Sequence, residues 1–453
     1  MLKSSSFNRF ATLSDGRKIL FNFLTLRLVA LEGVDAARVE SVLSNPVLPP
    51  RRGTVRLTQL LQHNGFLVDE ASNEASQLMR GFHQSREDES LLSLTILPTL
   101  SCNFRCTYCY EGEPAPEHMG GEVEAALVAF VEDRLRRGGR MSVCWYGGEP
   151  LLRKETVDTL SRAFLDLCAA RDVSYQASVI TNGYLLDRAT ASWLKGLGVG
   201  LAQVTLDGPP QVHDLRRPLA TGGGTFRTII DNLKAVSGLM DINVRMNVDA
   251  ENQEALGLLL DLLVEEGIAE RVTLYPAMTD SFTSTGTCVA DQCLGREKFS
   301  LVSLRTSLEL TRRGLPDRLV PMAHSLPCGA LRRATHIVTP SGGLAACWAR
   351  VTLPGKHIGH LLQPATADME ERRKEWFSFD PFALECRDCF ALPICMGACP
   401  EHYLVRRKLD CPVWKHHPEE HILNYYRLLI LQRQSEIAAG CRTVVDMLRK
   451  QSG

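Results

Sequence analysis

Three cysteines in the first quarter of the chain are spaced closely enough to hold one metal cluster. Cys102, Cys106 and Cys109 follow a C-x3-C-x2-C pattern, shortly after an apolar run at residues 91–97. Cysteine thiolates at short spacings of this kind hold iron–sulfur clusters, and three protein ligands would leave one iron of a four-iron cluster open to a substrate or cofactor. A zinc loop is the alternative, but zinc usually takes four ligands and no fourth Cys or His lies in this loop.

A second, larger group of cysteines lies near the C-terminus. It comprises Cys328, Cys347, Cys386, Cys389, Cys395, Cys399 and Cys411. The segment between them is rich in Gly, Pro and polar turn residues and would not form a core by itself, so bound metal would have to supply its cohesion. Two zinc ribbons are the generic alternative to further iron–sulfur clusters.

Length and composition exclude several classes of protein. The 453 residues allow two or three domains, and the 51 Lys and Arg against 52 Asp and Glu give no reason to expect a nucleic-acid or membrane-surface partner. No apolar run is long enough to span a membrane, and residues 1–10 lack the apolar segment of a signal peptide. We therefore expect a cytoplasmic protein whose 15 cysteines hold metal rather than disulfides.

Residues 91 to 280 alternate between strand and helix patterns, which predicts a parallel sheet built from βαβ units. The predicted strands are 92–97, 142–146, 177–180, 202–206, 243–248 and 272–275. The predicted helices between them include 121–136, 155–170, 226–237 and 253–266. Ligands of parallel α/β architectures gather at the C-terminal ends of the strands.

Several strand ends carry residues suited to a small ligand. Gly147 and Gly148 would let the backbone approach a ligand closely, and Glu149 could accept hydrogen bonds from an ammonium group. The next two strand ends offer short polar side chains where a ribose could lie. These are Asn182, Thr205 and Asp207. The segment that follows, residues 213–217, ends in Arg216 and Arg217. A guanidinium group can donate two parallel hydrogen bonds and therefore suits a carboxylate.

The cysteine loop, with Tyr108 as the aromatic residue of C-x3-C-x-aromatic-C, resembles the signature of radical S-adenosylmethionine (SAM) enzymes. The resemblance implies a partial (β/α)6 barrel, a SAM-binding [4Fe–4S] cluster on the three cysteines, and a flavodoxin- or ferredoxin-like electron donor. It implies that the Gly147–Glu149 turn holds the methionyl amine. It also implies that Arg217, four residues after His213, binds the SAM carboxylate, with Arg216 as the adjacent competitor.

The order and spacing of the second group resemble the SPASM domain, an extension of radical SAM enzymes that holds two auxiliary [4Fe–4S] clusters. By that resemblance Cys328, Cys347 and Cys399 ligate the first auxiliary cluster. The ligands implied for the second are Cys386, Cys389, Cys395 and Cys411. For a fourth ligand of the first cluster, Cys288 and Cys293 are candidates only if their loop folds back.

The remaining segments complete the predicted domain organisation. Residues 1–90 resemble the small winged-helix modules of peptide-modifying radical SAM enzymes, in which a leader peptide adds as a strand to a sheet edge; a structural cap is the alternative. The barrel would span 91–280 and a connector 281–327. The SPASM domain would follow at 328–412, with a closing helix at 413–453. Within residues 1–90 we predict a strand at 18–24, helices at 26–43, 55–62 and 70–82, and a second strand at 65–68.

Enzymes with this layout mostly act on peptides or proteins, which implies a maturase that forms a side-chain crosslink, a thioether or a related oxidation. An anaerobic sulfatase maturase that makes formylglycine is the main alternative. In that group an Asp follows the cysteine equivalent to Cys347, whereas Trp348 follows it here. A small-molecule SPASM dehydrogenase also remains open. A non-catalytic scaffold predicts loss of the SAM motifs, and these are present.

Overall fold

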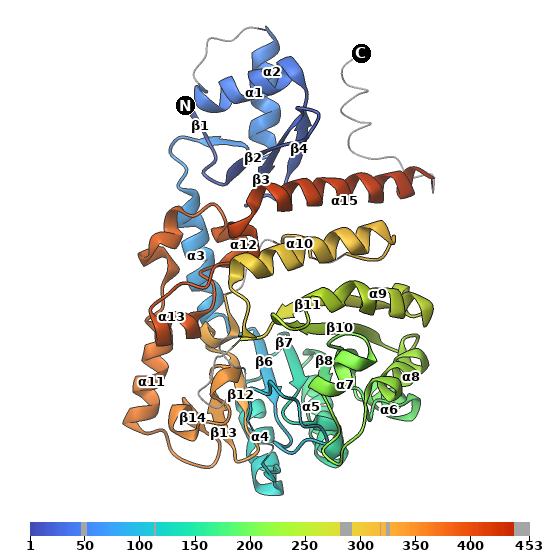
Figure 1. Cartoon of the computed structure of the whole chain (residues 1–453). Coiled ribbons are helices and arrows are strands. Elements are labelled where there is room, and N and C mark those ends of the chain that lie inside the picture. Colours follow the sequence, from blue (N-terminus) through green and yellow to red (C-terminus); the bar gives the residue numbers. More distant parts are fainter. Residues whose placement is uncertain (47–51, 113–114, 281–291, 318, 323–326, 439–453) are drawn as a thin grey trace.

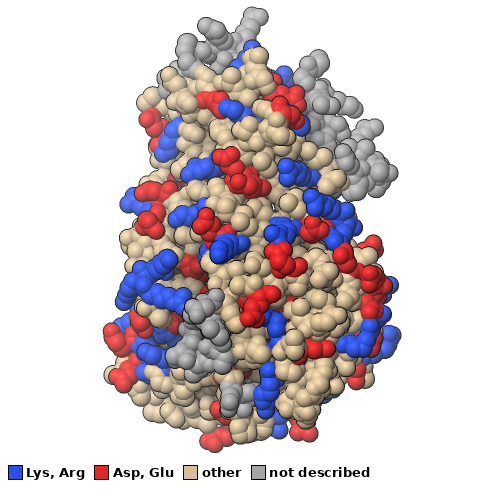
Figure 2. All heavy atoms as spheres, in the orientation of Figure 1, with Lys and Arg blue, Asp and Glu red and all other residues tan. Residues whose placement is uncertain are grey.

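The computed structural model describes the chain except for residues 47–51, 113–114, 281–291, 318, 323–326 and 439–453 (Figure 1). Among the described residues, no helix is both long and apolar enough to cross a lipid bilayer. On the face drawn in Figure 2, Lys and Arg side chains are interspersed with Asp and Glu outside the grey residues. This pattern agrees with the near-neutral balance of charged residues in the sequence.

A nine-stranded, mostly parallel sheet forms the centre of the molecule, in the order β11-β10-β9-β8-β7-β6-β12-β13-β14. Its six parallel core strands are β6 (Leu91–Ile96), β7 (Arg140–Trp145), β8 (Ser174–Thr181), β9 (Val199–Thr205), β10 (Asp241–Val248) and β11 (Val272–Met278). All six predicted strands are therefore present, in sequential spatial order and with somewhat different boundaries. This is the mixed α/β architecture expected for the partial barrel.

Amphipathic helices cover the outer face of this sheet. They are α4 (Gly121–Arg134), α5 (Lys154–Ala170), α6 (Arg188–Gly196), α7 (Pro210–Arg216), α8 (Phe226–Val236) and α9 (Leu256–Glu265). In α8 the buried residues Phe226, Ile229, Ile230 and Leu233 recur at helical spacing and join the core of the sheet. The prediction did not name α6 and α7.

Strand β10 illustrates how the sheet separates its core from its inner face. Ile242, Val244 and Met246 are buried in the main core, whereas the alternate residues Arg245 and Asn247 are only partly buried. Because successive side chains of a strand point to opposite faces, the alternation turns polar residues of β10 toward the inside of the barrel.

The N-terminal region contains a three-stranded antiparallel sheet and a separate two-stranded pairing. The sheet comprises β2 (Asn8–Thr12), β3 (Lys18–Asn22) and β4 (Leu28–Leu31), and β1 (Leu2–Ser4) pairs with β5 (Leu67–Asp69). Three helices accompany them: α1 (Gly33–Ser44), α2 (Arg52–His63) and α3 (Glu74–Glu87).

The prediction of one helix over residues 26–43 was wrong in its first part. Residues 28–31 form β4, which pairs with β3 so that Leu28 lies opposite Phe21, and α1 begins only at Gly33. Leu26 has a positive φ of 56° in the turn between the two strands. A short apolar run fits both periodicities, and here antiparallel pairing prevails over the helical pattern.

The C-terminal region extends the central sheet and then wraps back to the N-terminal one. Strand β12 (Thr335–Val338) pairs in parallel with β6, and β13 (Gly343–Ala345) and β14 (Gly359–His360) follow at that edge. The helices are α10 (Arg296–Arg312), α11 (Ala367–Phe377), α12 (Leu392–Cys395), α13 (Pro400–Arg406), α14 (Val413–His416) and α15 (Pro418–Ala438). Helix α10 lies within the predicted connector, and the predicted closing helix corresponds to α14 and α15 as far as Ala438.

The N-terminal sheet and the C-terminal cysteine region share one hydrophobic core. Phe21 and Phe23 are fully buried against Trp414, with ring centroids 6.1 and 6.0 Å away. Phe82 of α3 lies 5.6 Å from Phe382, and β3 runs beside α15 (Figure 1). Part of residues 1–90, predicted as a separate module, thus packs in one core with the C-terminal region, while α1 and α2 pack in a core of their own.

Candidate active site

A cavity of about 570 Å³ opens where the parallel core strands end. The residues that line it include Cys102, Cys106, Cys109, Tyr108, Gly147, Gly148, Asn182, Thr205 and Arg217, together with Cys347 and Trp348. Most of the sequence-predicted SAM contacts therefore meet in one place with the three cysteines. The Cys347-Trp348-Ala349 turn brings the second cysteine group to the same cavity.

The cysteine loop is held in place by the segment that follows α7. The backbone N–H of Arg105 donates to Pro218 O at 2.9 Å, that of Thr107 to Arg216 O at 3.0 Å, and that of Ala220 to Asn103 O at 2.8 Å. Backbone hydrogen bonds thus join the cysteine loop to residues 216–220, which include the predicted carboxylate-binding Arg217.

The three cysteines of the loop line the cavity together. Among the described residues, no three cysteines bring their Sγ atoms within 4.8 Å of one another. Four thiolates on one zinc ion, at Zn–S distances of about 2.3 Å, would bring every sulfur pair within about 4.6 Å. Burial raises the pKa of Cys102 and of Cys109 to about 12, so these thiols release protons when a metal binds. Three thiolates that line one cavity are a donor set that fits a [4Fe–4S] group.

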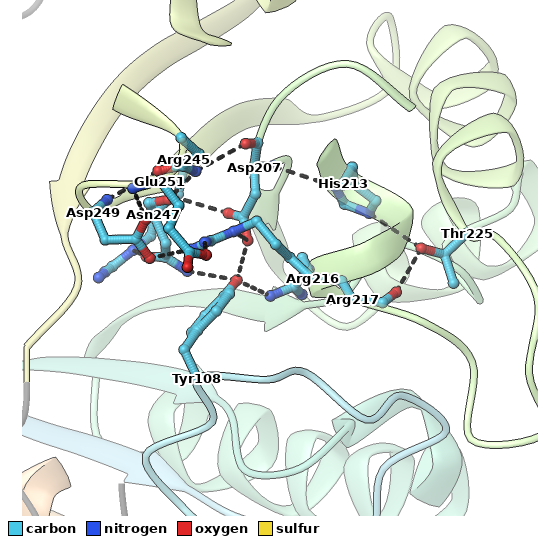
Figure 3. Close-up of polar contacts among 11 residues, drawn as sticks. Tyr108, Asp207, His213, Arg216, Arg217, Thr225, Arg245, Asn247, Asp249 and Glu251 are labelled. Atoms are coloured by element: carbon cyan, nitrogen blue, oxygen red, sulfur yellow. Dashed lines mark hydrogen bonds and ion pairs between the residues drawn. The ribbon is translucent and has the colours of Figure 1, made fainter. Parts of the chain in front are cut away.

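Tyr108 lies at the centre of a buried polar network (Figure 3). Its hydroxyl accepts hydrogen bonds from Arg217 Nη1 at 2.7 Å and from Asn247 Nδ2 at 3.1 Å, and donates to the Asp207 carboxylate. Asp207, which is fully buried, also accepts from the backbone N–H of Asn247 at 3.1 Å. Asp207 does not line the cavity, so its described contacts are those of a residue that positions Tyr108.

The two arginines of the motif have different surroundings. Arg216 is paired with Asp207 at 3.4 Å and Asp249 at 2.8 Å, and it does not line the cavity. Arg217 does line it, and its buried Nε has no hydrogen-bond partner among the described residues. An unpartnered buried donor beside a cavity is expected where a ligand completes the contact. This geometry supports Arg217, not Arg216, as the carboxylate-binding residue.

The Gly147-Gly148-Glu149 turn differs in its details from what the sequence suggested. A Cβ on Gly147 would lie 2.4 Å from Thr99 O, and one on Gly148 would lie 2.3 Å from Ser101 O. The glycines are therefore required by the close approach of the cysteine loop itself, and they line the cavity beside it. Only glycine fits at these two positions without moving the loop.

Glu149 is fully buried and does not line the cavity. Its carboxylate accepts hydrogen bonds from Thr181 Oγ1 at 2.8 Å and from the N–H groups of Asn182 at 2.8 Å and Leu151 at 3.0 Å. Burial raises the pKa of Glu149, although these three donors favour the ionised form. The described contacts tie the end of β7 to the end of β8, and direct contact of this carboxylate with an ammonium group stays a prediction.

Asn182 and Thr205, proposed near a ribose, both line the cavity. Asn182 Nδ2 donates to Asn103 Oδ1 at 2.7 Å, which links the end of β8 to the cysteine loop. Their role in ligand binding stays a prediction.

The second group of cysteines divides into two neighbourhoods. The charges of Cys328 and Cys399 both add to burial in raising the pKa of Cys347. Burial, with the charges of Cys395, Cys389 and Cys411, raises the pKa of Cys386 to about 12. The two ligand sets that the SPASM resemblance implies stay a prediction. Cys288 lies outside the described residues, and Cys293 is disulfide-bonded, contrary to the expectation that the chain holds no disulfides.

Two further groups of polar residues at the cavity were not predicted from the sequence. Gln203 and Arg245 line it from inside β9 and β10, where no motif marks them. Asp280 also lines it and contacts His402 Nε2 at 3.1 Å, while His402 Nδ1 contacts Asp410 at 3.0 Å. Burial lowers the pKa of His402, but the two carboxylates outweigh it and raise the pKa to about 9. His and Asp residues so far apart in sequence give no local signal.

The contrast between the two arginines predicts separable effects of substitution. Arg217→Ala is expected to weaken SAM binding by roughly 1.5–3 kcal/mol, the cost of a lost charged hydrogen bond, with little change in thermal stability. Arg216→Ala should instead destabilise the fold by about 3–5 kcal/mol, because it leaves buried carboxylates unpaired. SAM titration and thermal unfolding of the two reconstituted variants, with Arg217→Lys as the conservative control, measure both. Equal SAM affinities for the two Ala variants would contradict this assignment.

Comparison with known proteins gives a family match for the central part of the chain. Residues 96–263 match the family model of the Radical SAM superfamily. A probable GTP 3',8-cyclase of Archaeoglobus fulgidus is 26% identical over 301 residues, which cover 63% of this chain and 96% of that protein. An Fe-coproporphyrin III synthase of Methanosarcina barkeri is 27% identical over 219 residues, which cover 48% of this chain and 50% of that protein.

Two solved structures share the fold over most of the chain. The structure of anSMEcpe with bound AdoMet and the Kp18Cys peptide has a TM-score of 0.57 at 19% identity, and covers 76% of this chain and 99% of that one. Streptococcus suis SuiB bound to the precursor peptide SuiA has a TM-score of 0.50 at 14% identity, and covers 91% of this chain and 99% of that one. At these identities the likeness shows a common fold.

Proposed function

This chain is a radical SAM enzyme, and from that premise we propose that it modifies a residue of a ribosomally made peptide, by a crosslink, a thioether or a related oxidation. SAM and one [4Fe–4S] cluster are its cofactors, as in the rest of the superfamily. When bound, they supply a 5′-deoxyadenosyl radical for hydrogen abstraction, once a flavodoxin- or ferredoxin-type donor has delivered an electron.

The chain's own residues would bind and orient the cofactors. Cys102, Cys106 and Cys109 would ligate the cluster, and Arg217 would pair with the SAM carboxylate. Asn182 and Thr205 would contact the ribose, and Tyr108 is held by Asp207 and Asn247 so that Arg217 faces the cavity. Glu149 would act by fixing the glycine turn beside the methionyl amine.

The observation that carries the proposal is that Cys347 and Trp348 line the same cavity as the first three cysteines. A second cysteine group beside the reaction site is suited to a substrate that is oxidised there, and we propose that it holds two auxiliary [4Fe–4S] clusters. Their ligands would be the sets given above, Cys328, Cys347 and Cys399 for one and Cys386, Cys389, Cys395 and Cys411 for the other. The cavity's size suits SAM with one substrate side chain, not a folded domain.

The N-terminal sheet supports a peptide rather than a small-molecule substrate. Among the described residues, β4 pairs with β3 on one side and has no strand on its other side. A leader peptide could add there through backbone hydrogen bonds. The printed titles of the two structural neighbours describe complexes with peptides, which supports the same class of substrate.

Specific observations support two alternative functions. The relatives named as a GTP cyclase and a coproporphyrin synthase support a small-molecule substrate. The fold shared with anSMEcpe supports formylglycine formation. Against it, Trp348 stands at the sequence position where that group carries an Asp, and the ring centroids of Trp348 and Tyr146 are 4.5 Å apart.

The test is to incubate the anaerobically reconstituted, reduced enzyme with SAM and each short peptide encoded beside its gene. We expect 5′-deoxyadenosine together with a mass loss, in the peptide, that corresponds to removed hydrogen. Formylglycine in a sulfatase-derived peptide would favour the second candidate. Turnover of SAM coupled only to a small molecule would overturn the proposal.

A further inference from the structure

Arg245 is a cavity-lining cation that the SAM assignment does not use. It projects from β10, between Thr205 of β9 and Tyr275 of β11 in the strand register. Its Nε donates to Asn247 Oδ1 at 2.7 Å, and Tyr275 contacts the same guanidinium. An arginine carries five N–H donors, so these contacts fix its orientation and leave further donors for a ligand.

The charge of Arg245 is not balanced by the protein around it. Among the described residues, no carboxylate oxygen lies within 4.0 Å of its nitrogens, whereas Arg216 has two buried partners. The acidic residues that line the cavity have other contacts. Glu111 accepts a hydrogen bond from Tyr110 at 3.3 Å, and Asp280 is paired with His402.

A fixed, unbalanced guanidinium in a cavity wall attracts an anion that can accept two parallel hydrogen bonds. Arg217 lines the cavity beside the predicted SAM contacts, already has a role there and is held by Tyr108. Arg105 also lines the cavity, but it is exposed and donates to the backbone oxygens of Cys102 and Phe104. Arg245 lies on β10, whereas Arg217 directly follows α7, and the polar residues Gln203 and Asn247 line the cavity together with Arg245. If Arg217 binds the carboxylate of SAM, the anion that Arg245 binds therefore belongs to the substrate that shares the cavity with SAM.

We propose that Arg245 binds a carboxylate of the substrate, and that the peptide carries an Asp or Glu side chain next to the residue to be modified. The inference rests on the proposed peptide-modifying function and names a feature of its substrate. Arg245 would act as a specificity-determining residue that positions the peptide.

Small probes test the site independently of any peptide. We would measure binding of N-acetyl-glutamate N-methylamide and of N-acetyl-glutamine N-methylamide to the reconstituted, SAM-loaded enzyme. We expect the acid to bind about ten-fold more tightly than the amide to the wild type. The ratio should fall to about one in Arg245→Gln and recover in part in Arg245→Lys. Arg227→Gln, which changes an exposed arginine of α8, is the matched control and should keep the ratio.

Equal binding of acid and amide to the wild type would overturn the inference. So would a loss of SAM affinity in Arg245→Gln comparable to that in Arg217→Ala, because Arg245 would then serve SAM. N-acetyl-glutamine with a free C-terminal carboxylate separates the two sources of the anion: tighter binding of this compound than of the side-chain acid would overturn the choice of an Asp or Glu side chain.

Selection from a random-peptide library on the same enzyme separates this inference from the proposed function. Enrichment of Asp and Glu by the wild type, lost in Arg245→Gln, supports both. If the small acid binds through Arg245 but no peptide is selected, the carboxylate site stands and the peptide function fails. Peptides selected equally by both proteins, without acidic enrichment, would overturn the inference and leave the peptide function in place.

Discussion

A chain that begins at Leu91 is expected to lose the fold of its C-terminal cysteine region and the iron that this region would hold. Phe21, Phe23 and Phe82 are fully buried in the core shared with Trp414 and Phe382. Each buried phenylalanine contributes about 1.5–3 kcal/mol, and a whole domain is stable by only about 5–15 kcal/mol. Removing the N-terminal strands would therefore expose enough apolar surface to unfold the neighbouring region.

Iron content, gel filtration and thermal unfolding of the truncated protein measure this effect. Phe21→Ala in the full chain is the milder variant, with an expected cost of about 3–5 kcal/mol to the shared core. Phe66→Ala is the matched control, because Phe66 packs in the separate core formed with α1 and α2. A truncated chain that stays monomeric with its full iron content would show that the shared core is dispensable.

Replacing Cys102, Cys106 and Cys109 together with Ala is expected to abolish SAM cleavage. If the chain holds three clusters, the reconstituted protein carries about twelve irons, and this variant should lose about one third of them. Cys386→Ala combined with Cys411→Ala should lose a similar share and still cleave SAM without substrate. Iron analysis and 5′-deoxyadenosine assays on anaerobically reconstituted proteins distinguish the two variants.

Cys168→Ala provides the control, because that buried thiol contacts Met141 at 3.8 Å, away from both cysteine groups. Its iron content and SAM cleavage should match the wild type. Cleavage retained by the triple variant, or zinc in the C-terminal region of the wild type, would refute the ligand sets.

Much of this arrangement could be predicted from the sequence because its signals are local. The βαβ alternation specified six parallel strands, and that topology brings part of each motif predicted at the ends of β7, β8 and β9 to the cavity. The sequence alone distinguished Arg216 from Arg217 less clearly. The difference depends on Asp249, which lies far from both in the sequence and whose carboxylate is 2.8 Å from Arg216.

Other features depend on contacts between segments that are distant in the sequence, and no local sequence pattern predicts them. The pairing of β12 with β6 joins residues more than two hundred positions apart, and nothing in either strand specifies the partner. The role of Phe21 and Phe23 was hidden for the same reason, since an apolar strand looks alike whether it packs inside its own module or against another. Arg245 was missed because an inward-facing strand position carries no motif.

The pairing of β12 with β6 also sets an order for biosynthesis. Until residues 335–338 have left the ribosome, β6 remains an edge strand, and the cavity lacks Cys347 and Trp348. The loop of Cys102, Cys106 and Cys109, by contrast, and the strands β6 to β11 that support it are complete once residue 278 has been made. A nascent chain can therefore receive its first cluster at a site that is still open on one side, and the later cysteine region closes that side afterwards.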